Sequence, residues 1–103
     1  MDAFSALAEP RRRRIIEMLA SEGELSAKQV CARFDIAPQA ASQHLKVLLV
    51  AGLLKAERRS RRHIYQIDPD SMAEAEQWLA NTRRQWSGRR GDPDKPLKVG
   101  RKK

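Results

Sequence analysis

The sequence lacks several features that define whole classes of protein. Among its 103 residues there is one cysteine, Cys31, which cannot form a disulfide within the chain. The longest apolar run, 47–54, is interrupted by Gly52 and is far shorter than the roughly 20 residues of a membrane span. No basic stretch followed by an apolar run opens the chain, so we expect no secretory signal. Together these absences favour a cytoplasmic protein.

Basic residues, in contrast, are abundant and unevenly placed. The chain has 21 Lys and Arg against 13 Asp and Glu, a formal net charge of +8 that favours a polyanionic partner. The segment 37–66 has six basic residues and one acidic residue, and the segment 88–103 has seven and two. The second segment also holds two prolines and three glycines, which predicts a disordered tail that either attracts phosphate or aids solubility. We therefore expect one domain over 1–87 and a basic tail over 88–103.

Hydrophobic periodicity predicts a mainly α-helical domain with a small β-hairpin. Apolar residues at helical spacing, and the prolines, glycines and polar caps between them, divide the domain into short elements. The fifth helix is expected to begin at Ser71, because Ser71 and Glu74 have capping-box spacing. The expected elements are four helices, a hairpin and a last helix, over residues 4–8, 10–23, 26–34, 38–52, 54–67 and 71–86.

The third and fourth expected helices are joined by only three residues, 35–37, which is typical of a helix-turn-helix. Ala41, Leu45 and Leu48 fall on one face of the fourth helix and are expected to pack inward. The opposite face then presents amide, hydroxyl, methyl and ammonium groups, which suit base edges and phosphates in a major groove. Its residues are Gln39, Ala40, Ser42, Gln43 and Lys46. His44 either contacts DNA or forms a hydrogen bond within the domain.

Four arginines crowd the expected hairpin turn directly after this helix. Arg58, Arg59, Arg61 and Arg62 would repel one another unless anions lie nearby. A solvated charge run is the ordinary interpretation of such a cluster. Its position after a helix-turn-helix favours instead a DNA-binding wing, with double-stranded DNA as the partner.

The motifs in 4–16 (FSALAEPRRRRII), 37–54 (APQAASQHLKVLLVAGLL) and 58–67 (RRSRRHIYQI) closely resemble those of ArsR-type winged helix-turn-helix repressors. The resemblance implies a homodimeric, cytoplasmic repressor of its own or a neighbouring operon, bound to a near-palindromic operator. In that family the first and last helices form the dimer interface. The corresponding residues here are Phe4, Leu7, Met72, Ala75, Trp78, Leu79, Thr82 and Trp86. Two positions depart from the family pattern: Ser60 replaces a common glycine in the wing turn, and Ala37 replaces a common Ser or Thr N-cap.

Many relatives of this type sense metal ions, but this chain has few ligands for one. Soft ions need several thiolates, and the third helix offers Cys31 alone; the last helix has no histidine. We therefore expect no metal, no cofactor and no catalytic residue. Cys31 is either a small buried hydrophobic residue or a redox switch. For the domain as a whole, one alternative to DNA binding stays open, a protein-interaction module that does not read DNA.

Overall fold

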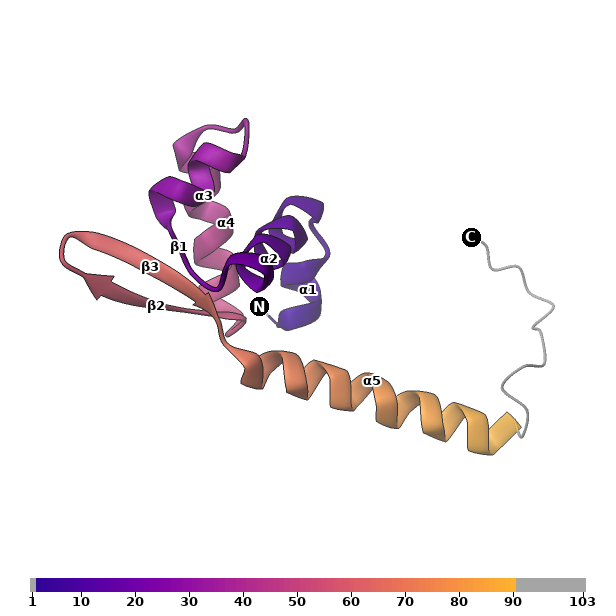
Figure 1. Ribbon diagram of the computed structural model, residues 1–103. Helices are drawn as coiled ribbons and strands as arrows, with labels where there is room; N and C mark the ends of the chain where they lie inside the picture. The colour runs from indigo at the N-terminus through magenta and orange to yellow at the C-terminus, as the bar shows by residue number, and fades with distance from the viewer. Residues whose placement is uncertain (1, 91–103) are drawn as a thin grey trace.

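The computed structural model of the chain describes residues 2–90, which form a group of helices, a small three-stranded sheet whose hairpin projects from them, and a long last helix (Figure 1). Four helices precede the hairpin and a long helix follows it, so the expected mainly α-helical fold is confirmed. The elements are α1 (Ala3–Leu7), α2 (Pro10–Glu22), β1 (Leu25–Ser26), α3 (Ala27–Arg33), α4 (Pro38–Val50), β2 (Leu54–Arg59), β3 (Arg62–Ile67) and α5 (Pro69–Arg90).

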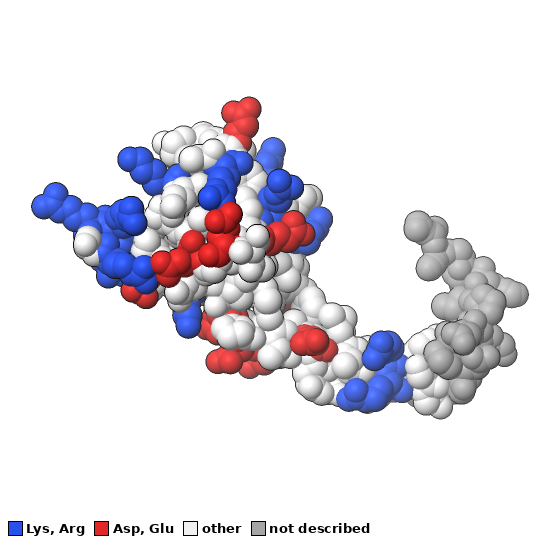
Figure 2. All heavy atoms as spheres, viewed as in Figure 1, with Lys and Arg blue, Asp and Glu red and all other residues white. Residues whose placement is uncertain are grey.

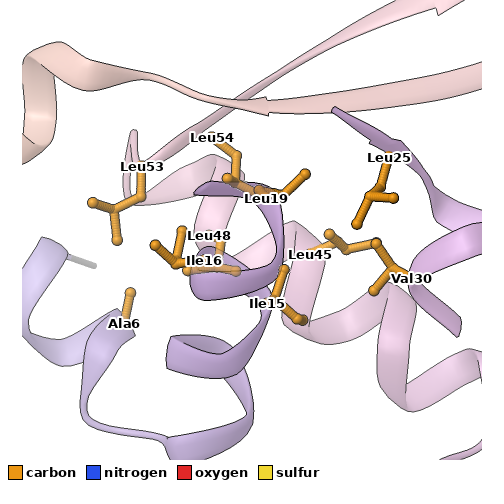
Figure 3. Packing of buried hydrophobic residues seen from close by; sticks show 10 residues of the cluster. All are labelled: Ala6, Ile15, Ile16, Leu19, Leu25, Val30, Leu45, Leu48, Leu53 and Leu54. Carbon is orange, nitrogen blue, oxygen red and sulfur yellow. The ribbon is translucent and has the colours of Figure 1, made fainter. Parts of the chain in front are cut away.

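The core lies where α2 and α4 meet the sheet (Figure 3). Ile15 and Leu19 of α2 and Leu45 and Leu48 of α4 are at most 1% exposed. These residues are spaced three or four apart along their helices, which places them on one face of each. The full cluster adds one more residue of α2, residues from α1, β1 and α3, and two at the entry to β2: Ile16, Ala6, Leu25, Val30, Leu53 and Leu54.

The end of α4 is closed by a Schellman motif that turns the chain into β2. The N–H of Leu53 donates to the carbonyl of Leu48, and the N–H of Gly52 donates to the carbonyl of Leu49, both at 3.0 Å. Gly52 has φ +82°, a left-handed conformation that costs little energy only for glycine. The motif places Leu53 and Leu54 in the core immediately after the helix.

The sheet contains one strand more than the sequence predicts. Its order is β1-β3-β2, and β1 pairs antiparallel with β3 through Leu25 opposite Tyr65 and Ser26 opposite Ile64. The expected hairpin of β2 and β3 is present, and Ser60 in its turn has φ 59°. A serine therefore holds the left-handed conformation for which a glycine is usual. The two residues of β1 tie the hairpin to the helical core.

The start of α5 differs from the prediction. The helix begins at Pro69, not at Ser71, and the carboxylate of Asp68 accepts a 3.1 Å hydrogen bond from the N–H of Asp70. Pro69 suits the first helical position because its missing N–H would have no partner there. The helix extends past Trp86 to Arg90, so the first three residues of the segment 88–103 belong to it. The rest of that segment, 91–103, lies outside the described residues.

Replacement of Gly52 by alanine tests the role of the Schellman motif. At φ +82° a side chain is strained, and its Cβ would lie 2.9 Å from Oγ of Ser71. We expect Gly52→Ala to lower the free energy of unfolding by about 1–2 kcal/mol, chiefly because of the left-handed backbone. Urea denaturation at a fixed protomer concentration measures the change.

Gly88→Ala is the matched control. Gly88 lies in α5, and nothing is within 4 Å of the position that a Cβ would take. Alanine favours a helix over glycine by about 1 kcal/mol at most, so this variant should be as stable as the parent or more stable. Equal stability of the two alanine variants would contradict the proposed role of Gly52.

Candidate nucleic-acid interface

The residues expected to read DNA lie on the outer face of α4. The opposite face is buried, since Ala41, Leu45 and Leu48 are 2%, 1% and 0% exposed. This burial fixes the rotation of the helix and leaves four polar side chains in solvent. The exposed residues are Gln39, Ser42, Gln43 and Lys46, and Ala40 between them is partly buried.

The first turn of α4 has Pro38 at its start and no side-chain cap. Ala37 holds the extended N-cap conformation, with φ −64° and ψ 146°, but its methyl group accepts no hydrogen bond. The departure noted at this position is therefore a real gap in the capping of α4. It lies two residues before Gln39, at the start of the turn that carries two of the candidate base contacts.

His44 lies on the flank of α4 rather than at the centre of its outer face. It is partly buried, and its Nδ1 is 3.5 Å from Nη1 of Arg12. Nε of Arg12 also donates to the carbonyl of Ala6 at 2.6 Å, so the same guanidinium reaches α1. His44 therefore faces α2 inside the domain.

The wing formed by β2 and β3 carries its four arginines in two different environments. Arg58, Arg61 and Arg62 are exposed, and none of them forms an ion pair within residues 2–90. Arg59, in contrast, pairs with Glu24 at 2.6 Å and with Glu57 at 3.0 Å. Figure 2 shows one group of basic atoms at the end of the hairpin, and others over the helices. Three of the four arginines are thus available to an anion.

The pairing changes the titration of both partners. Arg59 and Gln66 donate hydrogen bonds to the carboxylate of Glu24, and these bonds lower its pKa. The same contact with Glu24, together with Glu57, raises the pKa of Arg59. A depressed carboxylate pKa means that the pair is fully charged at neutral pH and is lost only as the pH falls through that lowered value.

A groove of about 520 Å³ separates the wing from α3. Lys28 stands on the α3 side, and Arg61, Arg62 and His63 stand on the wing side. Sequence reasoning did not place Lys28 beside the wing, because Lys28 lies more than 30 positions before Arg61 and Arg62. The pairing of β1 with β3 brings the two segments together.

The residues expected at a dimer interface form an apolar surface on α5 and α1. The rings of Phe4 and Trp78 meet edge to face, with centroids 5.5 Å apart and planes at 60°. Phe4, Trp78, Leu79 and Trp86 are 44%, 56%, 54% and 46% exposed. Thr82 is also exposed, whereas Leu7, Met72 and Ala75 are partly buried.

Cys31 is a free, partly buried thiol. It lines a mostly apolar hollow of about 450 Å³ between α3 and α4, beside Ala27, Ala41 and Leu45. Across the described part of the chain, no three His, Cys, Asp or Glu side chains come together as a metal site would need. None of the described helices is long and apolar enough to cross a membrane.

Comparison with known proteins gives the class first. Residues 7–57 match the family of helix-turn-helix domains, a range that runs from the end of α1 into β2. The HTH-type transcriptional regulator Rv2034 of Mycobacterium tuberculosis is 39% identical over 71 residues, which are 69% of this chain and 65% of that protein. The transcriptional repressor SdpR of Bacillus subtilis is 25% identical over 80 residues, 78% of this chain and 88% of SdpR. The chain thus spans just under two thirds of the length of Rv2034.

Solved structures narrow the class to one family. The ArsR family transcriptional regulator RHA00566 has a TM-score of 0.74 and 27% identity, with 82% of this chain and 86% of that chain covered. The winged helix-turn-helix domain of Mb0332 from Mycobacterium bovis, described as homodimeric and as a possible ArsR-family regulator, has a TM-score of 0.62 and 30% identity. That match covers 75% of this chain and 73% of the other. The chain belongs to the ArsR family of winged helix-turn-helix transcriptional regulators.

The uncapped start of α4 allows a test of how the first turn of this helix is held. A hydroxyl at position 37 can accept a hydrogen bond from the first turn, which the methyl group of Ala37 cannot do. We expect Ala37→Ser to raise the free energy of unfolding by about 1 kcal/mol. Urea denaturation measures it against Ala37→Val, which changes the size of the side chain but adds no acceptor. A serine variant no more stable than the valine variant would show that the gap in capping has no cost.

Proposed function

We propose that the protein is a homodimeric repressor that binds a near-palindromic operator and blocks access to a promoter. The observation that supports this most is the geometry of α4. One face is buried to at least 98% at Ala41, Leu45 and Leu48, and the face opposite is polar and exposed. The wing that follows α4 has three arginines without an ion pair in residues 2–90. A winged helix-turn-helix protein binds DNA through a helix that enters the major groove and a basic wing that contacts the phosphate backbone.

In this proposal α4 is the recognition helix. The amides of Gln39 and Gln43 pair with adenine edges, Ser42 donates or accepts, and Ala40 meets a thymine methyl group. Lys46 lies farther along the helix and neutralises a phosphate. His44 supports the helix from its flank through Arg12, 3.5 Å away.

The wing then holds the DNA backbone beside the groove. Arg58, Arg61 and Arg62 contact phosphates without reading sequence, because a phosphate presents the same oxygens at every step. Arg59 is not assigned this role, since its guanidinium is bound by two carboxylates of the protein. The segment 88–103 adds seven further basic residues, which attract DNA without sequence preference.

The second subunit docks against α1 and α5. The exposed aromatic and aliphatic groups of Phe4, Trp78, Leu79 and Trp86, with Thr82 among them, are covered by the same residues of the partner around a two-fold axis. Leu7, Met72 and Ala75 support this face from below. Two recognition helices related in this way enter successive major grooves about 34 Å apart, which gives the operator its symmetry.

Repression follows from occupancy. A dimer bound across a promoter excludes the polymerase, and we propose that the controlled operon is its own or a neighbouring one, in the cytoplasm. The name of SdpR as a transcriptional repressor and the homodimeric state of Mb0332 support the two halves of this proposal.

Two alanine variants separate base reading from backbone binding. Gln43→Ala should cost roughly 1–3 kcal/mol on DNA from the gene's own upstream region and should reduce the preference for it over random DNA. Arg61→Ala should weaken binding to both DNAs alike and reduce the salt dependence by about one unit. Gel-shift titrations with and without competitor DNA measure both effects.

Equal effects of the two variants on upstream and random DNA would contradict this division of roles. A parent protein with no preference for its upstream region over competitor would instead favour a protein-interaction module.

The proposed interface is tested by a charge on its apolar face. Leu79 is 54% exposed, so Leu79→Glu should leave the protomer folded but place two carboxylates in the dimer contact. Sedimentation should then show the parent at twice the protomer mass of 11.8 kDa and the variant at that mass itself. Val50→Glu, on α4 and 65% exposed, is the matched control and should stay dimeric. A parent that sediments as a monomer at micromolar concentration would contradict the interface.

A further inference from the structure

The wing has few attachments to the rest of the domain. Every residue from Lys55 to His63 is exposed, so this part of the hairpin has no apolar anchor. Backbone pairing with the core is limited to the two residues of β1, opposite Ile64 and Tyr65. An arm of this kind needs a further contact if its end is to hold one position.

Glu24 supplies that contact. Its carboxylate accepts hydrogen bonds from Nη1 and Nη2 of Arg59 at 2.6 and 3.3 Å, and from Nε2 of Gln66 at 3.0 Å. Arg59 belongs to β2 and Gln66 to β3, so one carboxylate holds both strands. It follows Gly23, the C-cap of α2, and is thus fixed to the helical core. Within residues 2–90, Glu24 is the one residue outside the wing whose side chain forms a hydrogen bond or ion pair with a side chain of the wing.

The position of the wing sets the width of the groove next to it. Arg61 and Arg62 line that groove from one side and Lys28 from the other. A wing that moves away from α3 separates these cations, so that they no longer contact the DNA backbone together.

We propose that Glu24 is a positioning residue for DNA binding: it holds the wing against the core so that Arg61 and Arg62 face the backbone together with Lys28. This inference rests on the proposed function, in which the wing binds phosphates. It gives Arg59 a different role from its three neighbours, because Arg59 is the link through which Glu24 acts.

Simple electrostatics predicts the opposite effect for Glu24. A carboxylate near DNA repels phosphate, and its removal also releases the guanidinium of Arg59 to bind one, so both effects would tighten binding. The positioning role predicts that removal of this carboxylate weakens binding. The sign of the change therefore distinguishes the two accounts.

The experiment measures binding of the full chain to a mixed-sequence duplex of about 30 base pairs by fluorescence anisotropy at low salt. Glu24→Gln should weaken binding roughly threefold to fivefold, the upper range for an exposed pair. Gln66→Ala removes one of the three hydrogen bonds with no change of charge and should weaken binding by a smaller factor. Glu57→Gln is the matched control, because it removes a carboxylate from the same arginine but leaves the link to the core intact. Its affinity should equal or exceed that of the parent.

Two further readouts separate positioning from a loss of folding. The unfolding midpoint of Glu24→Gln should stay close to that of the parent, since both partners of the pair are 40–47% exposed at their side chains. Backbone ¹⁵N relaxation should show faster motion at Ser60 and Arg61 in Glu24→Gln and unchanged motion in Glu57→Gln. In an Arg59→Gln background, Glu24→Gln should have little further effect on affinity.

Tighter or unchanged binding by Glu24→Gln would overturn the inference, as would wing amides that stay as rigid as in the parent. The proposed function fails separately. If the parent does not bind the duplex, or if Arg61→Ala binds as well as the parent, the wing does not bind phosphate, whatever Glu24 does.

Discussion

The burial of one face of α4 is the constraint on which the rest of the structure depends. Leu45 and Leu48 are at most 1% exposed, and a helix rotated by one residue, about 100°, would bring them into solvent. Their burial thus decides that Gln39 and Gln43 point outward. The Schellman motif at Gly52 then returns the chain to the core at Leu53, so the hairpin starts at a fixed angle to the helix. The outer face of α4 and the wing are placed by the same packing.

The arginines of the wing fall into two groups, one paired within the protein and the other exposed to solvent. The formal net charge of +8 does not describe the charge of the wing or of α4. Part of the surplus of basic residues lies in 91–103, and Arg59 in the wing is paired with carboxylates. At the base of the wing Arg59 is held by Glu24 and Glu57, while Arg61 and Arg62 near the turn have no ion pair in the described structure. Four arginines that look alike in the sequence therefore do different work. Arg59 is paired within the protein, and in the proposed function the other three bind phosphates.

The sequence predicted those parts of the fold that depend on short-range patterns. α2 and α4 have helical periodicity between a proline and a glycine, and the hairpin has polar residues in its turn. The predicted start of α5 was wrong. The Ser71–Glu74 spacing and Pro69 both indicate a helix start, and the helix begins at Pro69. β1 was missed because two residues show no alternation; it exists only because β3 offers an edge. The Glu24–Arg59 link spans 35 positions, and no local pattern contains it. The outward residues of α4 were placed by periodicity, whereas their contacts with DNA stay a prediction.

The most direct test of the account is the selection of bound fragments from random DNA by the full chain. A dimer with two outward α4 helices should enrich a motif of two inverted half-sites, with centres one helical turn apart, about 10–10.5 base pairs. The recovered motif reports sequence reading, two-fold symmetry and helix spacing in a single measurement. Recovery of DNA with no shared motif, or of a single half-site without its inverted partner, would contradict the account.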